Sequence, residues 1–158
     1  MGKEIERKFM VDKQKWSQYN KPVGQHYRQA YLVNEIEKTV RVRLTPDTAF
    51  LTIKSSTDYI SRAEYEYEIP VSDAIEILDR FCKNEISKNR YKPIIGGKRW
   101  DVDEFLGDNE GLILAEIELE FESQEFEKPD WIGEEVSGDE HYYNAYLIDH
   151  PYKTWKND

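Results

Sequence analysis

Residues 4–11, EIERKFMV, place two carboxylates and an ammonium group close together near the start of the chain. The alternation of charged and apolar residues predicts a β-strand, in which successive side chains point to opposite faces. Glu4, Glu6 and Lys8 therefore share one face. The question is whether that face lies in solvent or against a ligand.

The same alternation recurs along the chain and predicts a mainly β protein of the α+β class. Turn residues such as Gly96-Gly97 separate the segments. We expect eight strands, over residues 4–11, 26–33, 38–45, 48–55, 63–71, 86–93, 96–105 and 112–121. Helices are predicted at 12–19, 72–83 and 139–149. Short connections favour a largely antiparallel sheet, for which closure into a barrel is one arrangement.

Length and composition limit the class of protein. The 158 residues fit a single domain over 1–158, with 39% hydrophobic and 34% charged residues. We expect a cytoplasmic protein, because the start lacks an apolar signal core and the single cysteine, Cys82, excludes an internal disulfide. No apolar run approaches the roughly 20 residues that span a bilayer. A net charge of −10 argues against nucleic-acid and membrane partners.

The charged strand faces are the anomaly. Basic and acidic residues occupy different strands in blocks, at Glu4, Glu6 and Lys8; Arg41 and Arg43; Lys54; Arg62, Glu64, Glu66 and Glu68; Lys88 and Arg90; Asp101 and Asp103; and Glu116, Glu118 and Glu120. For any one strand, a solvated outer face explains such charges. The blocks together favour faces that point into a common lumen.

An empty lumen of this kind would be unstable, because like charges ~5 Å apart repel by roughly 3 kcal/mol at an effective dielectric near 20. Carboxylates supply the hard oxygen ligands that Mg²⁺ or Mn²⁺ prefer. Lysine and arginine supply charge-assisted hydrogen bonds for a phosphate chain. A divalent metal ion and a phosphate chain together would neutralise both blocks.

At this point the chain resembles the CYTH proteins, or triphosphate tunnel metalloenzymes. EIERKF is similar to the Glu-x-Glu-x-Lys signature of that family. The other matching segments follow in the family's order, from residue 3 to about 147: QAYL, VRVRL, LTIK, SRAEYEYEI, ISKNRY, WDVDEF, AEIELE and WIGEEVSGDEHYYN. The resemblance implies an eight-stranded antiparallel closed barrel that binds a triphosphate with Mg²⁺ or Mn²⁺.

The resemblance also implies roles for individual residues. The metal-side carboxylates are Glu4, Glu6, Asp103, Glu116 and Glu118, and the phosphate-binding cations are Lys8, Arg41, Arg43, Lys54, Lys88 and Arg90. Glu64 and Glu66 correspond to carboxylates that either hold a second metal ion or order the cations. Tyr31 and Lys88 correspond to a catalytic pair. Ser137 and His141 stand where the family more usually has Thr and Arg. The histidine at position 141 leaves open whether the last helix contacts an anion.

The family resemblance leaves several functions open, because fold alone does not select a substrate. The compact chain favours hydrolysis of inorganic triphosphate. The alternatives are a class IV adenylyl cyclase, a thiamine or nucleoside triphosphatase, and a module that binds polyphosphate or nucleotide without turnover. The sequence also leaves open how many metal ions bind, whether the protein forms a homodimer, and whether the tunnel is open at both ends.

Overall fold

The structure is a computed structural model that describes residues 4–35, 37–56 and 61–155. Its strands are β1 (Glu4–Val11), β2 (Gln25–Asn34), β3 (Lys38–Leu44), β4 (Ala49–Ser56), β5 (Ser61–Ile69), β6 (Ile86–Tyr91), β7 (Ile94–Ile95), β8 (Lys98–Phe105), β9 (Ile113–Glu118) and β10 (Ile132–Glu135). Its α-helices are α1 (Lys13–Gln18), α2 (Val71–Phe81) and α3 (Asn144–Leu147), and short 3-10 turns lie at Gly107–Asn109, Glu140–Tyr142 and Tyr152–Thr154.

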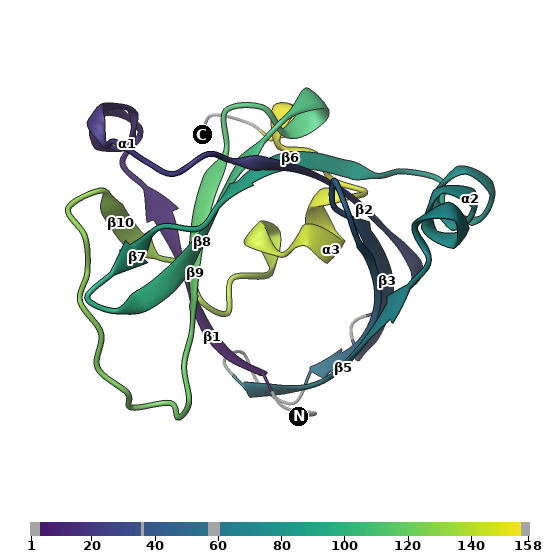
Figure 1. Cartoon of the computed structure of the whole chain (residues 1–158), viewed down its shortest axis with the longest axis horizontal. Coiled ribbons are helices and arrows are strands. Elements are labelled where there is room, and N and C mark those ends of the chain that lie inside the picture. The colour runs from purple at the N-terminus through teal and green to yellow at the C-terminus, as the bar shows by residue number, and fades with distance from the viewer. Residues whose placement is uncertain (1–3, 36, 57–60, 156–158) are drawn as a thin grey trace.

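Eight of the strands close into an antiparallel barrel (Figure 1). The order β1-β5-β4-β3-β2-β6-β8 is completed by β9, which pairs with both β8 and β1. This confirms the expected mainly β fold and the closed eight-stranded barrel. The two short strands that the sequence pattern missed extend the sheet at its margins, with β7 against β8 and β10 against β1.

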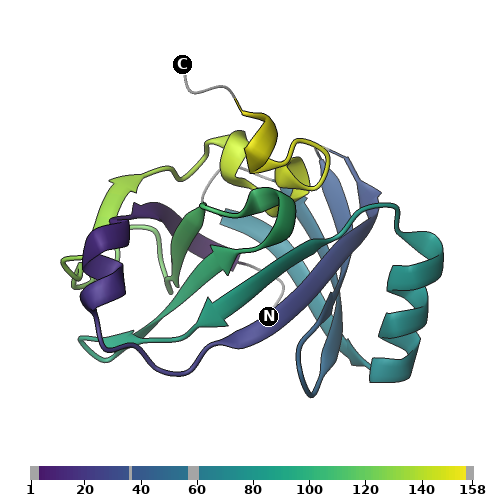
Figure 2. The ribbon, with the colours of Figure 1, turned by 90° about the horizontal axis from the view of Figure 1, so that it is seen from above.

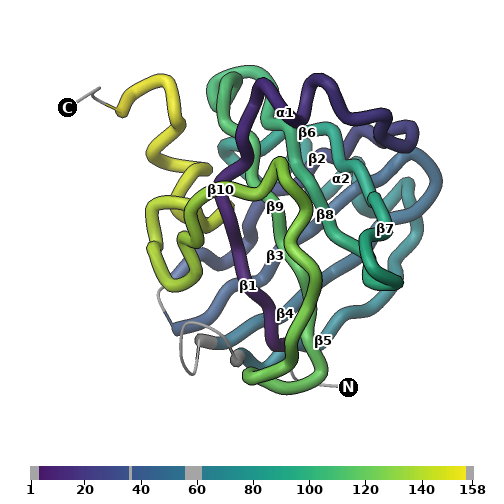
Figure 3. Tube along the Cα trace, turned by 90° about the vertical axis from the view of Figure 1, so that its left-hand side faces the viewer, coloured from purple at the N-terminus to yellow at the C-terminus, as the bar shows by residue number. Residues whose placement is uncertain are grey.

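The barrel is built with its apolar side outward. In β1, Phe9 is buried on the outer face, whereas Lys8 points inward and faces Glu116 of β9 across the pair. Trp100 and Trp131 pack with Phe9 outside the wall, where α1 and the segment 119–131 cover it. Figure 3 shows that segment running along the outside of the barrel to β10, beside β1. The largest apolar cluster therefore lies outside the lumen, which frees the lumen for charges.

Helix α2 covers a second part of the outer wall. Its apolar face packs Ala74 and Leu78 onto Ala30 of β2, Val42 of β3 and Ala49 of β4, all of them buried. The small Ala side chains let the helix lie close to the strands. Ala30 thus serves helix packing, and its side chain takes no place in the lumen.

The C-terminal segment, residues 136–155, which we call the cap, lies across one end of the barrel (Figures 1 and 2). Leu147 of the cap is buried against Ile86, Phe105 and Leu114, which stand at inward positions of β6, β8 and β9. An apolar plug therefore fills this part of the lumen.

The helix predicted at 139–149 is wrong in its extent. The chain forms a 3-10 turn at Glu140–Tyr142, is extended at Tyr143, and forms only the short α3. The carbonyl of Tyr142 accepts a 3.0 Å hydrogen bond from the Lys8 ammonium group and so takes no place in a continuous helix. Cys82 lies half-buried just beyond the end of α2. Within the described ranges, no helix combines the length and apolarity needed to span a membrane.

Candidate functional site

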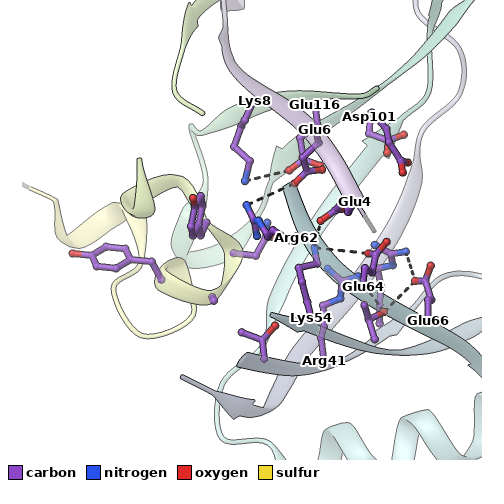
Figure 4. Close-up of a pocket in the computed structure, with 18 of the residues that line it drawn as sticks. Glu4, Glu6, Lys8, Arg41, Lys54, Arg62, Glu64, Glu66, Asp101 and Glu116 are labelled. Atoms are coloured by element: carbon purple, nitrogen blue, oxygen red, sulfur yellow. Dashed lines mark hydrogen bonds and ion pairs between the residues drawn. The ribbon is translucent and has the colours of Figure 1, made fainter. Parts of the chain in front are cut away.

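A cavity of about 950 Å³ occupies the lumen, and charged side chains line it (Figure 4). The alternating strands turn one face of each inward, so the charges that the sequence placed in blocks meet in one space. The cationic residues of the lining include Lys8, Arg41, Arg43, Lys54, Arg62, Lys88 and Arg90, and the acidic ones include Glu4, Glu6, Glu64, Glu66, Asp101, Glu116 and Glu118. The alternative of solvated outer faces does not hold for these residues.

Three of the predicted metal-side carboxylates lie close enough to influence each other. Burial, together with the charges of Glu116 and Glu4, raises the pKa of Glu6 to about 8. Burial also opposes ionisation of Glu116, but the charges of Lys8 and Arg90 outweigh it and lower the pKa of that carboxyl. One side of the cavity therefore holds more carboxylate than its neighbouring cations neutralise. That excess suits a divalent cation.

The carboxylates do not form a ready-made metal cage. Within the described part of the chain, no three His, Cys, Asp or Glu side chains come together closely enough to hold an ion. Glu4 instead pairs with Lys54 at 3.0 Å, and Arg62 reaches Glu6 at 4.0 Å. Glu118, opposite Glu6 in the β1–β9 pair, is more exposed than these residues, and burial followed by the charges of Glu4 and Asp101 raises its pKa. The donor set fits a hard cation, provided that these ion pairs rearrange around it.

The proton on Glu6 gives a testable stability effect in the metal-free protein. Its pKa is about 8 when folded against 4.5 in its ordinary state, so the folded protein holds the proton between those values and the unfolded chain does not. The free energy of unfolding from this group therefore falls as pH rises from about 5 to 8. In EDTA, the melting temperature of the Glu6→Gln variant should fall less between pH 5 and pH 8 than that of the wild type. Glu76→Gln, on the exposed face of α2, should keep the wild-type loss, and equal losses in all three proteins would contradict the effect.

Cations from β3, β4 and β5 line the part of the lumen next to Glu4 and Glu6. Arg41 donates to Thr52 at 3.3 Å, and Arg43 pairs with Glu66 at 3.3 Å. Lys54 lies between Glu4 and Glu64, at 3.0 and 3.9 Å. Glu64 and Glu66 thus form ion pairs with two of the predicted phosphate-binding cations, Lys54 and Arg43.

Asp103, one of the predicted metal-side carboxylates, binds two cations in the structure. It is buried beneath the cavity wall and binds Arg90 through both carboxylate oxygens, at 2.7 and 2.9 Å. The Lys88 ammonium group lies 2.8 Å from the same carboxylate. These cations hold the pKa of Asp103 well below its usual range, although burial opposes ionisation. Asp103 therefore anchors two cations, and it lies close enough to Glu116 for its charge to act on the pKa of that carboxyl.

Lys88 is the cation with the most perturbed environment. Burial is the main cause, and with the nearby charge of Arg90 it lowers the pKa of Lys88 to about 7 despite the ion pair with Asp103. Because Arg90 already binds Asp103 on both oxygens, the carboxylate compensates Lys88 only in part. An amine with this pKa exchanges its proton near neutral pH, as a general base must.

Tyr31 lines the same cavity as Lys88. The ammonium group of Lys88 bonds to Asp103 and to the side-chain oxygen of Asn144, at 3.1 Å, in the cap. In the strand register Lys88 faces Tyr27, whereas Tyr31 faces Arg41. The two residues of the predicted pair thus share the cavity without a direct hydrogen bond in the described structure.

Three lining residues were given no role by the resemblance, although Arg62 and Asp101 were among the charged faces expected to point into the lumen. Arg62 and Asp101 occur in the alternating charged strands, and that alternation was the available signal. Asn144 lies in the cap, and nothing in the pattern indicated that its side chain reaches Lys88. Ser137 accepts a 2.9 Å hydrogen bond from the backbone of Lys8 and so fastens the cap to β1. Ser137 supplies the same hydroxyl acceptor that the more usual Thr would supply.

His141 lies outside the lining of the cavity. It is exposed and contacts Asp139 at 2.8 Å, so it supplies no anion contact within the lumen. The anion contact that the resemblance left open at this position is therefore absent from the lining of the cavity.

Comparison with known proteins agrees with this geometry. A family model for the CYTH domain matches residues 2–145. The chain is 52% identical over 157 residues to an inorganic triphosphatase of Acetivibrio thermocellus, with 99% of each chain covered. It is 33% identical to an inorganic triphosphatase of Nitrosomonas europaea, covering 91% of this chain and 95% of that one. The crystal structure of the inorganic triphosphatase NE1496 superposes with a TM-score of 0.63 at 30% identity, covering 92% and 97% of the two chains.

Proposed function

The chain belongs to the CYTH domain family, and from that premise we propose that it hydrolyses inorganic triphosphate inside its barrel with Mg²⁺ or Mn²⁺. The observation that carries the proposal is the meeting of both charge blocks in one cavity of about 950 Å³. The whole-length similarity to an inorganic triphosphatase, at 52% identity, supports that substrate over a nucleotide. We further propose that residues 1–158 act as one domain.

The carboxylates that fit a metal ion are those of β1 and β9. Glu4 and Glu6 of β1 and Glu116 and Glu118 of β9 would hold it, with Asp101 beside them in the cavity. A bound divalent ion supplies charge neutralisation for phosphate oxygens. Asp103 is left out of this set, because its oxygens are occupied by Arg90 and Lys88.

The cations bind and orient the triphosphate. Arg41, Arg43 and Lys54 offer their charge from β3 and β4, next to the metal-side carboxylates, so the chain would extend from those carboxylates along the cations. Phosphoryl transfer depends chiefly on positioning and charge stabilisation, which these side chains provide. Arg90, held on Asp103, keeps its orientation when the substrate enters or leaves.

Lys88 accepts the proton of the attacking water in this proposal. Its neutral amine forms above a pKa of about 7, within reach of the cavity from β6. Tyr31 lines the same space and would orient the water or the terminal phosphate. The proton passes from water to the Lys88 Nζ atom as the water oxygen attacks the terminal phosphorus. The bond from that phosphorus to the bridging oxygen breaks, and orthophosphate and diphosphate are the products.

A role for Lys88 as the base predicts a pH profile. At saturating metal, kcat/KM should rise about tenfold per pH unit below pH 7 and level off above it, because only the deprotonated amine accepts the proton. Lys88→Arg, which keeps the charge and does not deprotonate, should remove this rise together with most of the activity. A wild-type profile that is flat from pH 6 to 9 would exclude Lys88 from this role.

The substrate is tested by phosphate release from inorganic triphosphate, ATP and thiamine triphosphate, each with Mg²⁺ and with Mn²⁺, while cyclic AMP is followed in the ATP reaction. The proposal expects the highest kcat/KM with inorganic triphosphate. Cyclic AMP formation would instead identify a cyclase. Stable binding of every substrate without turnover would identify a binding module.

A further inference from the structure

A second cavity, of about 320 Å³, lies at the mouth of the barrel opposite the cap. Gln25, at the start of β2, lines it, whereas Asn34 at the other end of that strand donates to the carbonyl of Ala145 in the cap at 2.8 Å. The turn at 45–48 between β3 and β4 supplies another wall and lies on the side away from the cap (Figure 2). The two ends of the barrel thus carry different surfaces.

The second cavity has a strong excess of positive charge. Its lining includes four cationic side chains, Arg43, Arg90, Lys92 and Arg99, and one carboxylate, that of Asp47.

Three of the four cations gather around the ring of Tyr27. The ring centroid lies 5.1 Å from Arg90, 5.5 Å from Arg43 and 5.9 Å from Lys92. Burial, together with the charges of Arg41 and Arg90, lowers the pKa of Arg43 to about 10. This repulsion between cations would be relieved by a bound anion.

Lys92 distinguishes this cavity from the central one. The three arginines line both cavities, and each has a carboxylate partner in the barrel. Lys92 lines only the second of these two cavities, and its ammonium group lies over the Tyr27 ring. Within residues 4–35, 37–56 and 61–155, no carboxylate forms an ion pair with it. Its ammonium group is therefore available for a ligand.

We propose that this second cavity binds a tetrahedral oxyanion, inorganic phosphate, through Lys92 and the three arginines at the mouth opposite the cap. The source of the phosphate rests on the proposed function. It is either the orthophosphate released in the central cavity or the terminal phosphate of a linear polyphosphate longer than three units. The arginines shared by the two cavities connect them in both cases.

The site is tested by calorimetric titration of orthophosphate into metal-free protein, which requires no turnover. Lys92→Gln should weaken the binding about tenfold, which corresponds to the loss of one charged contact. Lys92→Arg should retain wild-type affinity. Lys83→Gln, which removes an exposed lysine near the end of α2, should also bind as the wild type does. Superimposable isotherms for Lys92→Gln and wild type, with both proteins folded by circular dichroism, would overturn the proposal.

Kinetic measurements on the same variants separate the two sources. If the phosphate is the released product, Lys92→Gln weakens inhibition of triphosphate hydrolysis by added orthophosphate. If it is a chain end, Lys92→Gln raises KM for longer linear polyphosphate more than for triphosphate. A failure of triphosphate hydrolysis would count against the proposed function and leave the orthophosphate titration as a separate result.

Discussion

Glu4→Gln combined with Glu6→Gln should lower kcat/KM for inorganic triphosphate by about 10³-fold at millimolar Mg²⁺ or Mn²⁺. The two carboxylates stand in β1 beside Glu116, where burial, together with the charges of Glu116 and Glu4, raises the pKa of Glu6 to about 8. The amides keep the shape but remove the charge that attracts a divalent ion. Loss of several kcal/mol of transition-state charge stabilisation corresponds to this factor, since about 1.4 kcal/mol is tenfold in rate.

The matched control removes the same number of charges outside the barrel. Asp73→Asn with Glu76→Gln changes two exposed carboxylates of α2 and should leave kcat/KM within twofold of wild type. Titration of Mn²⁺, followed by the electron paramagnetic resonance of the free ion, should show weakened binding only in the Glu4/Glu6 variant. Wild-type hydrolysis by that variant would show that these carboxylates do not support the reaction.

Asp103→Asn should lower the free energy of unfolding by about 3 kcal/mol. The carboxylate is buried and holds Arg90 through both oxygens and Lys88 through one, so its removal leaves Lys88 without a carboxylate partner and Arg90 with only Asp101, at 3.5 Å. Breaking a buried ion pair in this way costs about 3–5 kcal/mol. The lower end is expected because Lys88, with a pKa of about 7, can lose its proton near neutral pH. Urea unfolding measures the change.

An exposed ion pair provides the control for that measurement. Asp108 lies 2.9 Å from Lys153, but their side chains are 66% and 62% exposed. Asp108→Asn should therefore change the unfolding free energy by less than about 1 kcal/mol. A change for Asp103→Asn that is no larger than this would contradict its role as a buried anchor. A large loss of Mn²⁺ affinity in a stable Asp103→Asn protein would instead return Asp103 to the metal ligands.

Much of the barrel could be predicted from the sequence because period two fixes the face of each side chain. Once Glu4 and Glu6 share a face with Lys8, closure brings that whole set into the lumen, and the same holds for Arg41 with Arg43. The sequence pattern did not predict the short strands β7 and β10, because two or four residues carry too little alternation to detect. Pairing at the margins of the sheet decides their conformation.

The contacts within the site could not be predicted in the same way. Strand alternation placed Asp103 on the inward face. Only the register shows that it lies opposite Arg90 and accepts hydrogen bonds from that guanidinium group. The cap is a second example, since Tyr142 and Asn144 reach Lys8 and Lys88 across sequence separations of 134 and 56 residues. Such long-range hydrogen bonds leave no periodic signal, and they broke the helix that local spacing predicted.

The central claim is that metal ion and triphosphate lie together inside the barrel. The most direct measurement is an anomalous-scattering map from a crystal grown with Mn²⁺ and a non-hydrolysable triphosphate analogue. The account predicts a manganese peak in the lumen beside Glu4 and Glu6, with the phosphate chain extending toward Arg41 and Lys54. Manganese or phosphate bound only to the outer surface of the barrel would contradict it.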